Sequence, residues 1–245
     1  MITVITMAGL GSRFKKAGYI EPKYMLEVHG KTLFEWSISS LKGFKNITEY
    51  IFIVRKEDKS HDFIVEKCKQ LEIEQYKMIE INYLTKGQAE TAMLAQKYWI
   101  LDEELLIYNI DTYIEPYVMN NKEIKGDGFI PCFNAEGNHW SFVKTDIQER
   151  AIEVREKERI SDNCTVGAYY FKTVQLYIEL YQQRYSSDKN LDAGEQYIAP
   201  LYNDLILKDG NVYIQNISKE KVHVLGTPEE LEFFQKYNFS KNNTF

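Results

Sequence analysis

The chain has 245 residues, of which 44% are hydrophobic and 27% are charged, and these ordinary globular proportions exclude a disordered chain. The 36 acidic and 30 basic residues give a formal net charge of −6, which excludes the broad basic surface of a non-specific nucleic-acid binder. No window approaches the roughly 18 apolar residues of a membrane span. Three widely spaced cysteines predict reduced thiols in a cytoplasmic protein rather than a zinc site.

The first half of the chain predicts strands that alternate with helices. Residues 2–7 form a continuous apolar run rich in β-branched side chains, which is typical of a central strand covered on both faces. Further predicted strands span 50–54, 78–84 and 105–109, and the predicted helices span 33–41, 58–71 and 88–99. This alternation predicts an α/β fold with a parallel, doubly wound sheet, in which ligands bind beyond the carboxyl ends of the strands.

The second half has a less regular pattern. Its predicted strands span 129–133, 141–144, 165–171, 212–217 and 222–225, and its predicted helices span 174–185, 195–207 and 228–237. The sequence has no linker rich in Pro or Ser and no internal repeat. We therefore expect a single domain over residues 1–245, with a frayed polar tail at 240–245.

A glycine-containing loop directly follows the first predicted strand. Residues 9–13 read G-L-G-S-R, and Lys23 follows a short distance later. The glycines let backbone N–H groups turn towards an anion, Arg13 offers a forked donor for phosphate oxygens, and Lys23 offers a mobile charge. The loop is not a Walker A motif, because no G-K-[ST] follows, nor is it G-x-G-x-x-G, because Phe14 stands in the last position. On the glycines alone, a tight strand-to-helix turn is the alternative.

With the Pro-Lys pair at 22–23 and the His-Gly-Lys that ends an apolar stretch at 29–31, this loop resembles the signature of the nucleotidyltransferase superfamily. The superfamily includes sugar-1-phosphate nucleotidylyltransferases and small cytidylyltransferases. The resemblance implies a Rossmann-like, doubly wound, mixed and mostly parallel sheet. It also implies a reaction that joins an NTP to a phosphate-bearing acceptor and releases pyrophosphate.

The resemblance implies that residues 1–115 bind the nucleotide and residues 116–239 bind the acceptor. Arg13 would stabilise the reacting phosphates, and Lys23 would bridge nucleotide and acceptor. Gly87 and Gln88 resemble the family's G-T-A-x-A segment beside the base, although Gly87 taken alone reads as a simple turn. The nucleotide-binding residues implied by the resemblance are Ala8, Gly9, Gly11, Ser12, Arg13, Gly87 and Gln88.

Asp111 resembles the family's strand-end aspartate that holds Mg²⁺, so the resemblance implies Mg²⁺ as the cofactor and Arg13, Lys23 and Asp111 as catalytic residues. Carboxylate and phosphate oxygens are ligands that Mg²⁺ prefers, whereas an Asp after a strand, taken alone, is more often a turn residue or helix cap. The implied acceptor-binding residues are Glu156 and Lys157 in a V-R-E-K segment, Gly167 in the next strand, and Glu195. By charge pattern alone, residues 155–159 read as a solvated surface run.

One position departs from the family pattern. Sugar nucleotidyltransferases commonly place a second metal-binding Asp two residues before a late Gly-Thr, and this chain has Val224 there. Three interpretations follow. Asp111 and the phosphates hold Mg²⁺ alone, Asp192 or Glu195 replaces the missing carboxylate, or the chain is a degenerate relative with weak activity.

The function implied by the resemblance is nucleotidyl transfer of the EC 2.7.7 type in nucleotide-sugar and polysaccharide biosynthesis. The default acceptor is a sugar 1-phosphate, which gives an NDP-sugar, and a non-sugar phosphate such as phosphocholine, which gives a CDP-linked product, stays open. One alternative is a GT-A-type glycosyltransferase, although the D-x-D motif is missing at residues 111–113. The other is a non-catalytic nucleotide-binding relative. We expect no nucleic-acid or membrane partner, and a homodimer stays open.

Overall fold

The computed structural model describes residues 1–186, 191 and 194–239, so the predicted tail at 240–245 lies outside the described residues. The strands are β1 (Ile2–Thr6), β2 (Glu27–Val28), β3 (Lys31–Thr32), β4 (Glu49–Arg55), β5 (Tyr76–Ile81), β6 (Leu105–Asn109), β7 (Thr112–Ile114), β8 (Gly128–Asn134), β9 (Ser141–Thr145), β10 (Ala151–Glu156), β11 (Asn163–Thr165), β12 (Ala168–Phe171), β13 (Val212–Ile217) and β14 (Val222–Val224). The helices are α1 (Ser12–Lys16), α2 (Leu33–Ser39), α3 (His61–Gln70), α4 (Gln88–Met93), α5 (Val174–Tyr185), α6 (Leu201–Leu207) and α7 (Pro228–Gln235), with 3₁₀ helices η1 (Lys23–Met25), η2 (Lys56–Asp58), η3 (Leu94–Tyr98) and η5 (Lys219–Lys221).

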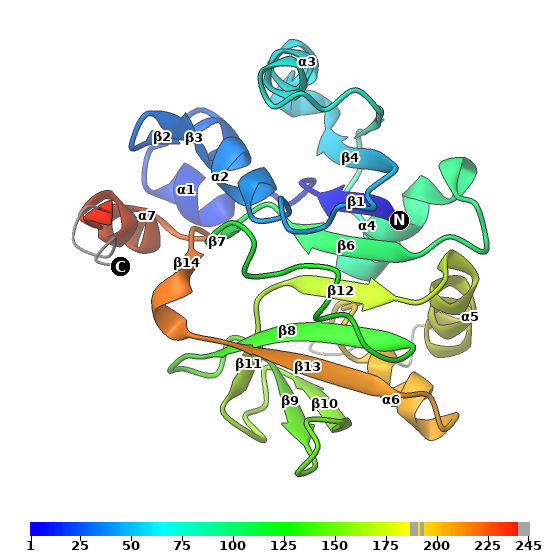
Figure 1. Cartoon of the computed structure of the whole chain (residues 1–245). Helices are drawn as coiled ribbons and strands as arrows, with labels where there is room; N and C mark the ends of the chain where they lie inside the picture. Colours follow the sequence, from blue (N-terminus) through cyan, green and yellow to red (C-terminus); the bar gives the residue numbers. More distant parts are fainter. Residues whose placement is uncertain (187–190, 192–193, 240–245) are drawn as a thin grey trace.

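One large mixed sheet runs through the molecule in the order β10-β9-β11-β8-β12-β6-β1-β4-β5, with β13 paired to β8 (Figure 1). The strands β6, β1, β4 and β5 are parallel to one another, whereas β12 is antiparallel to both β6 and β8. This arrangement confirms the predicted α/β fold with a Rossmann-like mixed sheet. The parallel strands place the loop after β1 and the residues after β6 at one edge of the sheet.

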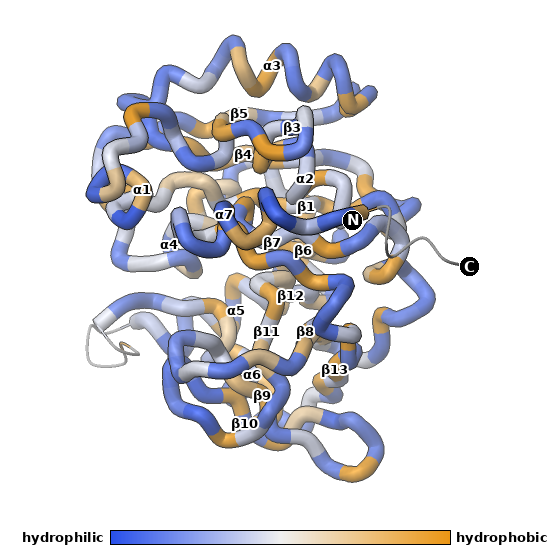
Figure 2. Tube along the Cα trace, turned by 90° about the vertical axis from the view of Figure 1, so that its left-hand side faces the viewer, coloured by the Kyte–Doolittle hydropathy of each residue, from blue (hydrophilic) through white to orange (hydrophobic). Residues whose placement is uncertain are grey.

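Apolar side chains cover both faces of the central strands. In β1, Val4 packs in one cluster with the alanines of α4 and with residues of α5 and α6, whereas Ile5 packs in another with Phe34 of α2 and Ile64 of α3. This alternation between faces is the two-residue period of a strand, and it explains why the whole run is apolar. Figure 2 shows hydrophobic stretches along the strands of the interior, and alternating hydrophilic and hydrophobic stretches along α3.

The chain returns to its first half at the C-terminus. β14 pairs antiparallel with β7, and the Leu225 N–H donates to the Asp111 carbonyl at 2.8 Å. Helix α7 then packs beside α1 and α2, where Leu231 and Phe234 join a cluster with Phe14 and Leu33 (Figure 1). The late segment 225–230 therefore lies next to the first loop, although more than half of the chain separates them in sequence.

Two predicted elements of the second half were wrong in extent. The predicted strand 165–171 is divided into β11 and β12, because Gly167 adopts a φ of +81° between them. The predicted helix 195–207 begins only at Leu201, after Pro200 at its N-cap. Helix α4 also ends early, at Met93, and the chain continues as η3. Strands β2, β3, β7 and β10 were missed.

All three cysteines, Cys68, Cys132 and Cys164, are free thiols, as the sequence predicts, and the structure buries all three. Burial raises the pKa of the Cys68 thiol to about 12. Within the described ranges, no helix is long and apolar enough to cross a membrane.

Candidate functional site

The first loop leaves its backbone open on one side. Gly11 has a φ of +60° and forms the N-cap of α1, and a Cβ added at Gly9 or Gly11 would meet no atom within 4 Å. The loop borders a small cavity of about 210 Å³, whose lining also includes Ser12, Arg13, Lys23 and Gly226. Ala8 is buried and is not among the residues that line this cavity. The loop can therefore present backbone N–H groups to an anion between Arg13 and Lys23.

Lys23 and Asp111 form an ion pair at the edge of this cavity. The Lys23 ammonium donates to Asp111 Oδ2 at 2.7 Å, and the two side chains are only 19% and 28% exposed. Burial would raise the pKa of Asp111, but the charge and hydrogen bond of Lys23, together with the charge of Arg13, hold it below its ordinary value. The Asp111 carboxylate is therefore ionised at neutral pH and already has a cation on one oxygen.

A second cavity of about 400 Å³ adjoins the first, and Arg13 and Gly226 line both. The structure brings together in it residues of both halves that the sequence singled out: Arg13, Gln88, Asp111, Glu156, Lys157, Gly167 and Glu195. Lys23 reaches this group through its ion pair with Asp111. The predicted positive charges and the predicted carboxylate thus converge at one place, although the chain as a whole is acidic.

An amide network forms part of the wall of the larger cavity. The Gln88 side-chain amide donates to Asn109 Oδ1, which also accepts from the Thr6 hydroxyl at 3.3 Å. Gly167 lies against this network, because a Cβ there would stand 2.6 Å from Asn109 Nδ2. Gly167 therefore allows β12 to approach the end of β6 closely and keeps the Asn109 amide in place.

Gly87 lies where the start of α4 contacts the backbone of Gln196 in the second half of the chain. It does not line either of the two cavities. Its φ of +151° belongs to a region that glycine alone adopts readily, and a Cβ there would stand 2.5 Å from the Gln196 carbonyl oxygen. On either side of Gly87, the Gln196 N–H donates to the Lys86 carbonyl and the Ala89 N–H donates to the Gln196 carbonyl. These contacts position Glu195, the neighbour of Gln196, at the cavity.

Lys157 extends from the end of β10 into the larger cavity. Its backbone φ is +57°, and its N–H donates to the Trp140 carbonyl at 2.8 Å. The ammonium lies 4.7 Å from the ring centroid of Tyr197 and donates to the Tyr197 hydroxyl. Burial would lower the pKa of Lys157, but Tyr197 and the carboxylates Glu156 and Glu195 raise it. Lys157 therefore stays protonated in the cavity.

Val224 lines the larger cavity and has no group that binds a metal. Of the two residues expected to compensate, Asp192 lies outside the described residues and Glu195 lines the cavity. Glu230 was not predicted as a site residue. Its Oε2 accepts the Gly226 N–H at 2.9 Å, and a Cβ at Gly226 would stand 3.5 Å from this oxygen and 3.4 Å from Asp111 Oδ2. The signal for it was the Thr-x-x-Glu spacing from Thr227, which is typical of a helix capping box.

His223, next to Val224, carries no charge near pH 7. Its ring is buried and stacks on Tyr113 with centroids 5.3 Å apart. Burial lowers the pKa of His223 to about 4, and its Nε2 has no hydrogen-bond partner in the described part of the chain. The positive charge of the site therefore comes from Arg13, Lys23 and Lys157.

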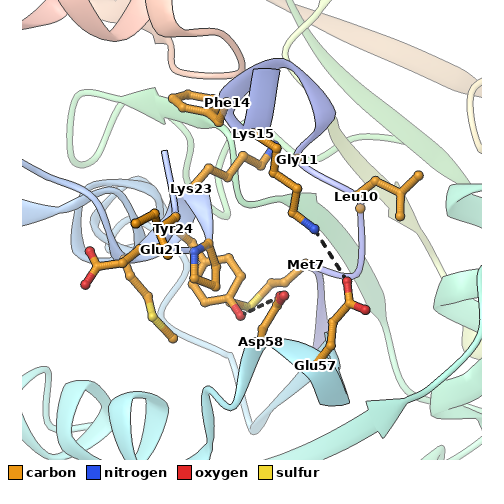
Figure 3. A pocket seen from close by; sticks show the side chains of 14 residues that line it. Met7, Leu10, Gly11, Phe14, Lys15, Glu21, Lys23, Tyr24, Glu57 and Asp58 are labelled. Carbon is orange, nitrogen blue, oxygen red and sulfur yellow. Dashed lines mark hydrogen bonds and ion pairs between the residues drawn. The ribbon is translucent and has the colours of Figure 1, made fainter. Parts of the chain in front are cut away.

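Another cavity, of about 440 Å³, lies on the other side of the first loop (Figure 3). Lys15 pairs with Glu57 at 3.5 Å, and the Tyr24 hydroxyl donates to Asp58 at 3.0 Å, as the dashed lines in Figure 3 mark. Glu21 also lines this side. Lys15 and Lys23 line it beside Glu21, Glu57 and Asp58, so acidic and basic side chains are mixed in this cavity, as they are in the cavity around Asp111.

The donor set suits a metal ion that phosphate oxygens help to hold. No group of three or more His, Cys, Asp or Glu side chains in residues 1–186, 191 and 194–239 could hold a metal by itself. Asp111 nevertheless binds a cation in this structure, the Lys23 ammonium. Its Oδ2 also lies 3.4 Å from the position that a Cβ at Gly226 would take. The space next to this carboxylate is therefore free of side-chain atoms of residue 226, and the residues fit a hard cation such as Mg²⁺.

A nucleoside-diphosphate-sugar pyrophosphorylase from Vibrio cholerae RC9 has a similar structure, with 37% sequence identity and a TM-score of 0.88 over 97% of this chain and 100% of that one. Two further solved structures share the fold. An inositol-1-phosphate CTP transferase from T. maritima has 13% identity and a TM-score of 0.73 over 98% of this chain and 92% of that one. A CTP:phosphocholine cytidylyltransferase from Streptococcus pneumoniae has 17% identity and a TM-score of 0.71 over 96% of this chain and 97% of that one. No family model and no curated protein matches the sequence. The identity to the Vibrio protein over the full length shows that this chain is a nucleotidyltransferase and belongs to the sugar-phosphate nucleotidyltransferase superfamily.

Proposed function

We propose that this nucleotidyltransferase joins an NTP to a sugar 1-phosphate, giving an NDP-sugar and pyrophosphate. The observation that carries the proposal is the convergence of Arg13, Lys157 and Asp111 around one cavity, with Lys23 bound to Asp111. Two polyanions that react with each other need closely placed cations; this cavity supplies two, and Lys23 lies beside it on Asp111. The full-length likeness to a nucleoside-diphosphate-sugar pyrophosphorylase supports a sugar as the acceptor.

The nucleotide side of the proposed site is the first loop. We propose that backbone N–H groups of Gly9, Gly11 and Ser12 and the guanidinium of Arg13 hold the triphosphate. Gln88 would contact the base or ribose from the start of α4, where its amide now bonds Asn109. Gly87 would not touch the nucleotide. It would let the start of α4 pack closely against the backbone of Gln196, and so place Gln88.

The acceptor side is the part of the cavity formed by β10, β12 and the segment around Glu195. We propose that Lys157 binds the acceptor phosphate and that Glu156 and Glu195 accept hydrogen bonds from sugar hydroxyls. Gly167 lines the same cavity and leaves room there for the Asn109 side chain, which forms part of the wall that the acceptor would meet. An ammonium and two carboxylates around one cavity suit a ligand that carries both a phosphate and hydroxyl groups.

In the proposed reaction, an oxygen of the acceptor phosphate attacks the α-phosphorus in line. The new bond is P–O–P between acceptor and nucleotide, and the bond from the α-phosphorus to the bridging oxygen of the β-phosphate breaks. Pyrophosphate leaves with that electron pair. Lys23 and Arg13 hold the two reacting phosphates together and balance the charge that develops between them.

Asp111 would hold Mg²⁺ in this proposal, because its ionised carboxylate lines the larger cavity with Arg13 and no side chain of residue 226 fills the space beside it. When bound, Mg²⁺ neutralises phosphate charge and polarises a phosphoryl oxygen. We also propose a cytoplasmic location, where an NTP would be supplied and where free thiols such as Cys68 stay reduced.

A pyrophosphate-release screen tests this function. Each of the four NTPs is combined with Mg²⁺ and with a panel of sugar 1-phosphates, inositol 1-phosphate, phosphocholine and unphosphorylated sugars. We expect release with one preferred NTP and with sugar 1-phosphates only. Release with phosphocholine or inositol phosphate instead would contradict the sugar assignment, and binding of an NTP without release for any acceptor would favour a non-catalytic relative. Sugar transfer from a nucleotide-sugar would favour a glycosyltransferase.

A further inference from the structure

The late segment 225–230 brings a second carboxylate to the space next to Asp111. A Cβ built on Gly226 would stand 3.4 Å from Asp111 Oδ2 and 3.5 Å from Glu230 Oε2. Both carboxylate oxygens therefore face one small volume, which is free only because residue 226 is glycine. Glu230 also lines the same 400 Å³ cavity as Asp111 and Arg13.

Backbone contacts fix this arrangement. The Leu225 N–H donates to the Asp111 carbonyl at 2.8 Å, the Gly226 N–H donates to Glu230 Oε2 at 2.9 Å, and the Glu230 N–H donates to the Thr227 hydroxyl at 3.1 Å. The placement of both carboxylates beside Gly226 thus results from the pairing of β14 with β7 and from the cap of α7. It does not depend on long, flexible side chains alone.

Two neighbouring carboxylates repel each other unless a cation lies between or beside them. In this structure Lys23 binds Asp111 Oδ2 at 2.7 Å, and the charge of Arg13 also acts on Asp111. If Lys23 moves to the phosphates during the proposed reaction, Asp111 and Glu230 are left facing the same volume. A divalent cation held by phosphate oxygens would then restore the charge balance.

We propose that Glu230 supplies the second carboxylate of the cation site, in place of the aspartate that is missing at position 224. The inference rests on the proposed function, because the cation enters with the triphosphate. Neither Asp192 nor Glu195, the candidates from the sequence, is needed for this role. The alternative is that Glu230 only caps α7, and a cap needs an acceptor oxygen but no negative charge.

Glu230→Gln separates these two roles, because glutamine keeps an oxygen that accepts the Gly226 N–H but removes the charge. The matched control is Glu229→Gln on the neighbouring, exposed residue of the same helix. Gly226→Ala is a second test, since its Cβ would fill the space between the carboxylates while both charges remain. Thermal unfolding of each variant checks that it is folded.

The readout is Mn²⁺ binding to the full chain, measured by water-proton relaxation with each of the four α,β-methylene NTP analogues. We expect Glu230→Gln and Gly226→Ala to weaken binding of the Mn²⁺ complex by about tenfold or more, and Glu229→Gln to leave it unchanged. Val224→Asp added to Glu230→Gln should restore affinity.

Binding by Glu230→Gln as tight as that of the wild type would overturn the inference, even if Asp111→Asn is weak. Absence of Mn²⁺ binding in the wild type would also overturn it. The first result leaves the proposed function intact, whereas the second would also contradict the Mg²⁺ role proposed for Asp111; pyrophosphate release by the wild type decides the reaction itself separately.

Discussion

Replacing Lys23 with methionine is expected to lower turnover by about two powers of ten or more, with a smaller change in the apparent affinity for the NTP. Lys23 is the cation closest to Asp111, at 2.7 Å, and it lies between the first loop and the cavity that holds Lys157. Its ammonium is therefore placed to stabilise charge between the two phosphates. Steady-state pyrophosphate release over a range of NTP and acceptor concentrations measures the effect.

The matched control for this prediction is Lys16→Met. Lys16 is an exposed lysine on α1, near the same loop but outside the residues that line the cavities, so turnover should stay close to that of the wild type. Because Lys23 also neutralises Asp111, the free energy of unfolding of both variants should be measured as well. A Lys23→Met rate within about threefold of the wild-type rate would remove Lys23 from the mechanism.

Gly87→Ala is expected to destabilise the protein by about 3 kcal/mol, the combined effect of backbone strain and of a clash in a packed region. The new Cβ would stand 2.5 Å from the Gln196 carbonyl oxygen and 2.6 Å from its nitrogen, and these backbone atoms cannot rotate away. The shift would also move Glu195 and Gln88. We therefore expect a higher KM for both substrates, measured beside the denaturant-unfolding free energy.

Gly194→Ala is the control for backbone strain. Gly194 has a φ of +85°, but a Cβ there would meet no atom within 4 Å. Its loss of stability should therefore be limited to about 1 to 2 kcal/mol of conformational strain. Equal losses in the two variants would show that the close approach of Gly87 to Gln196 does not matter for stability.

Local patterns predicted much of the fold. The predicted limits of β6, β13 and α5 agree with the structure, and β1 and β4 differ by one or two residues. These elements are continuous apolar runs or clear helical repeats whose burial does not depend on distant details of the chain. The free-thiol state of the cysteines was also predicted and is confirmed, whereas their burial was not predicted.

The elements that were predicted wrongly depend on contacts between distant segments. The strand at 165–171 is divided at Gly167 because Asn109, far away in sequence, occupies the space beside it. The segment before Leu201 is not helical because Gln196 pairs with the backbone at Lys86 and Ala89. Neither contact leaves a local periodic signal, so a reading of the sequence alone extends the nearest regular element.

In the candidate site, too, residues beside a regular local pattern could be predicted, and residues placed by distant contacts could not. The first loop and Asp111 could be found because each directly follows a buried strand, and their roles came from the family resemblance. Glu230 and Tyr197 could not be found, since their relevance depends on where α7 and the segment after residue 194 fold back. The binding roles of Gly87, Glu156, Glu195 and the other singled-out residues stay predictions.

The central claim, attack of an acceptor phosphate oxygen on the α-phosphorus, is tested most directly with an acceptor whose phosphate carries ¹⁸O. After one round of reaction, ³¹P NMR of the product should show the isotope shift at the nucleotide α-phosphorus, with ¹⁸O in the P–O–P bridge. The released pyrophosphate should be unlabelled. Label in the pyrophosphate, or an α-phosphorus resonance without the shift, would contradict the account.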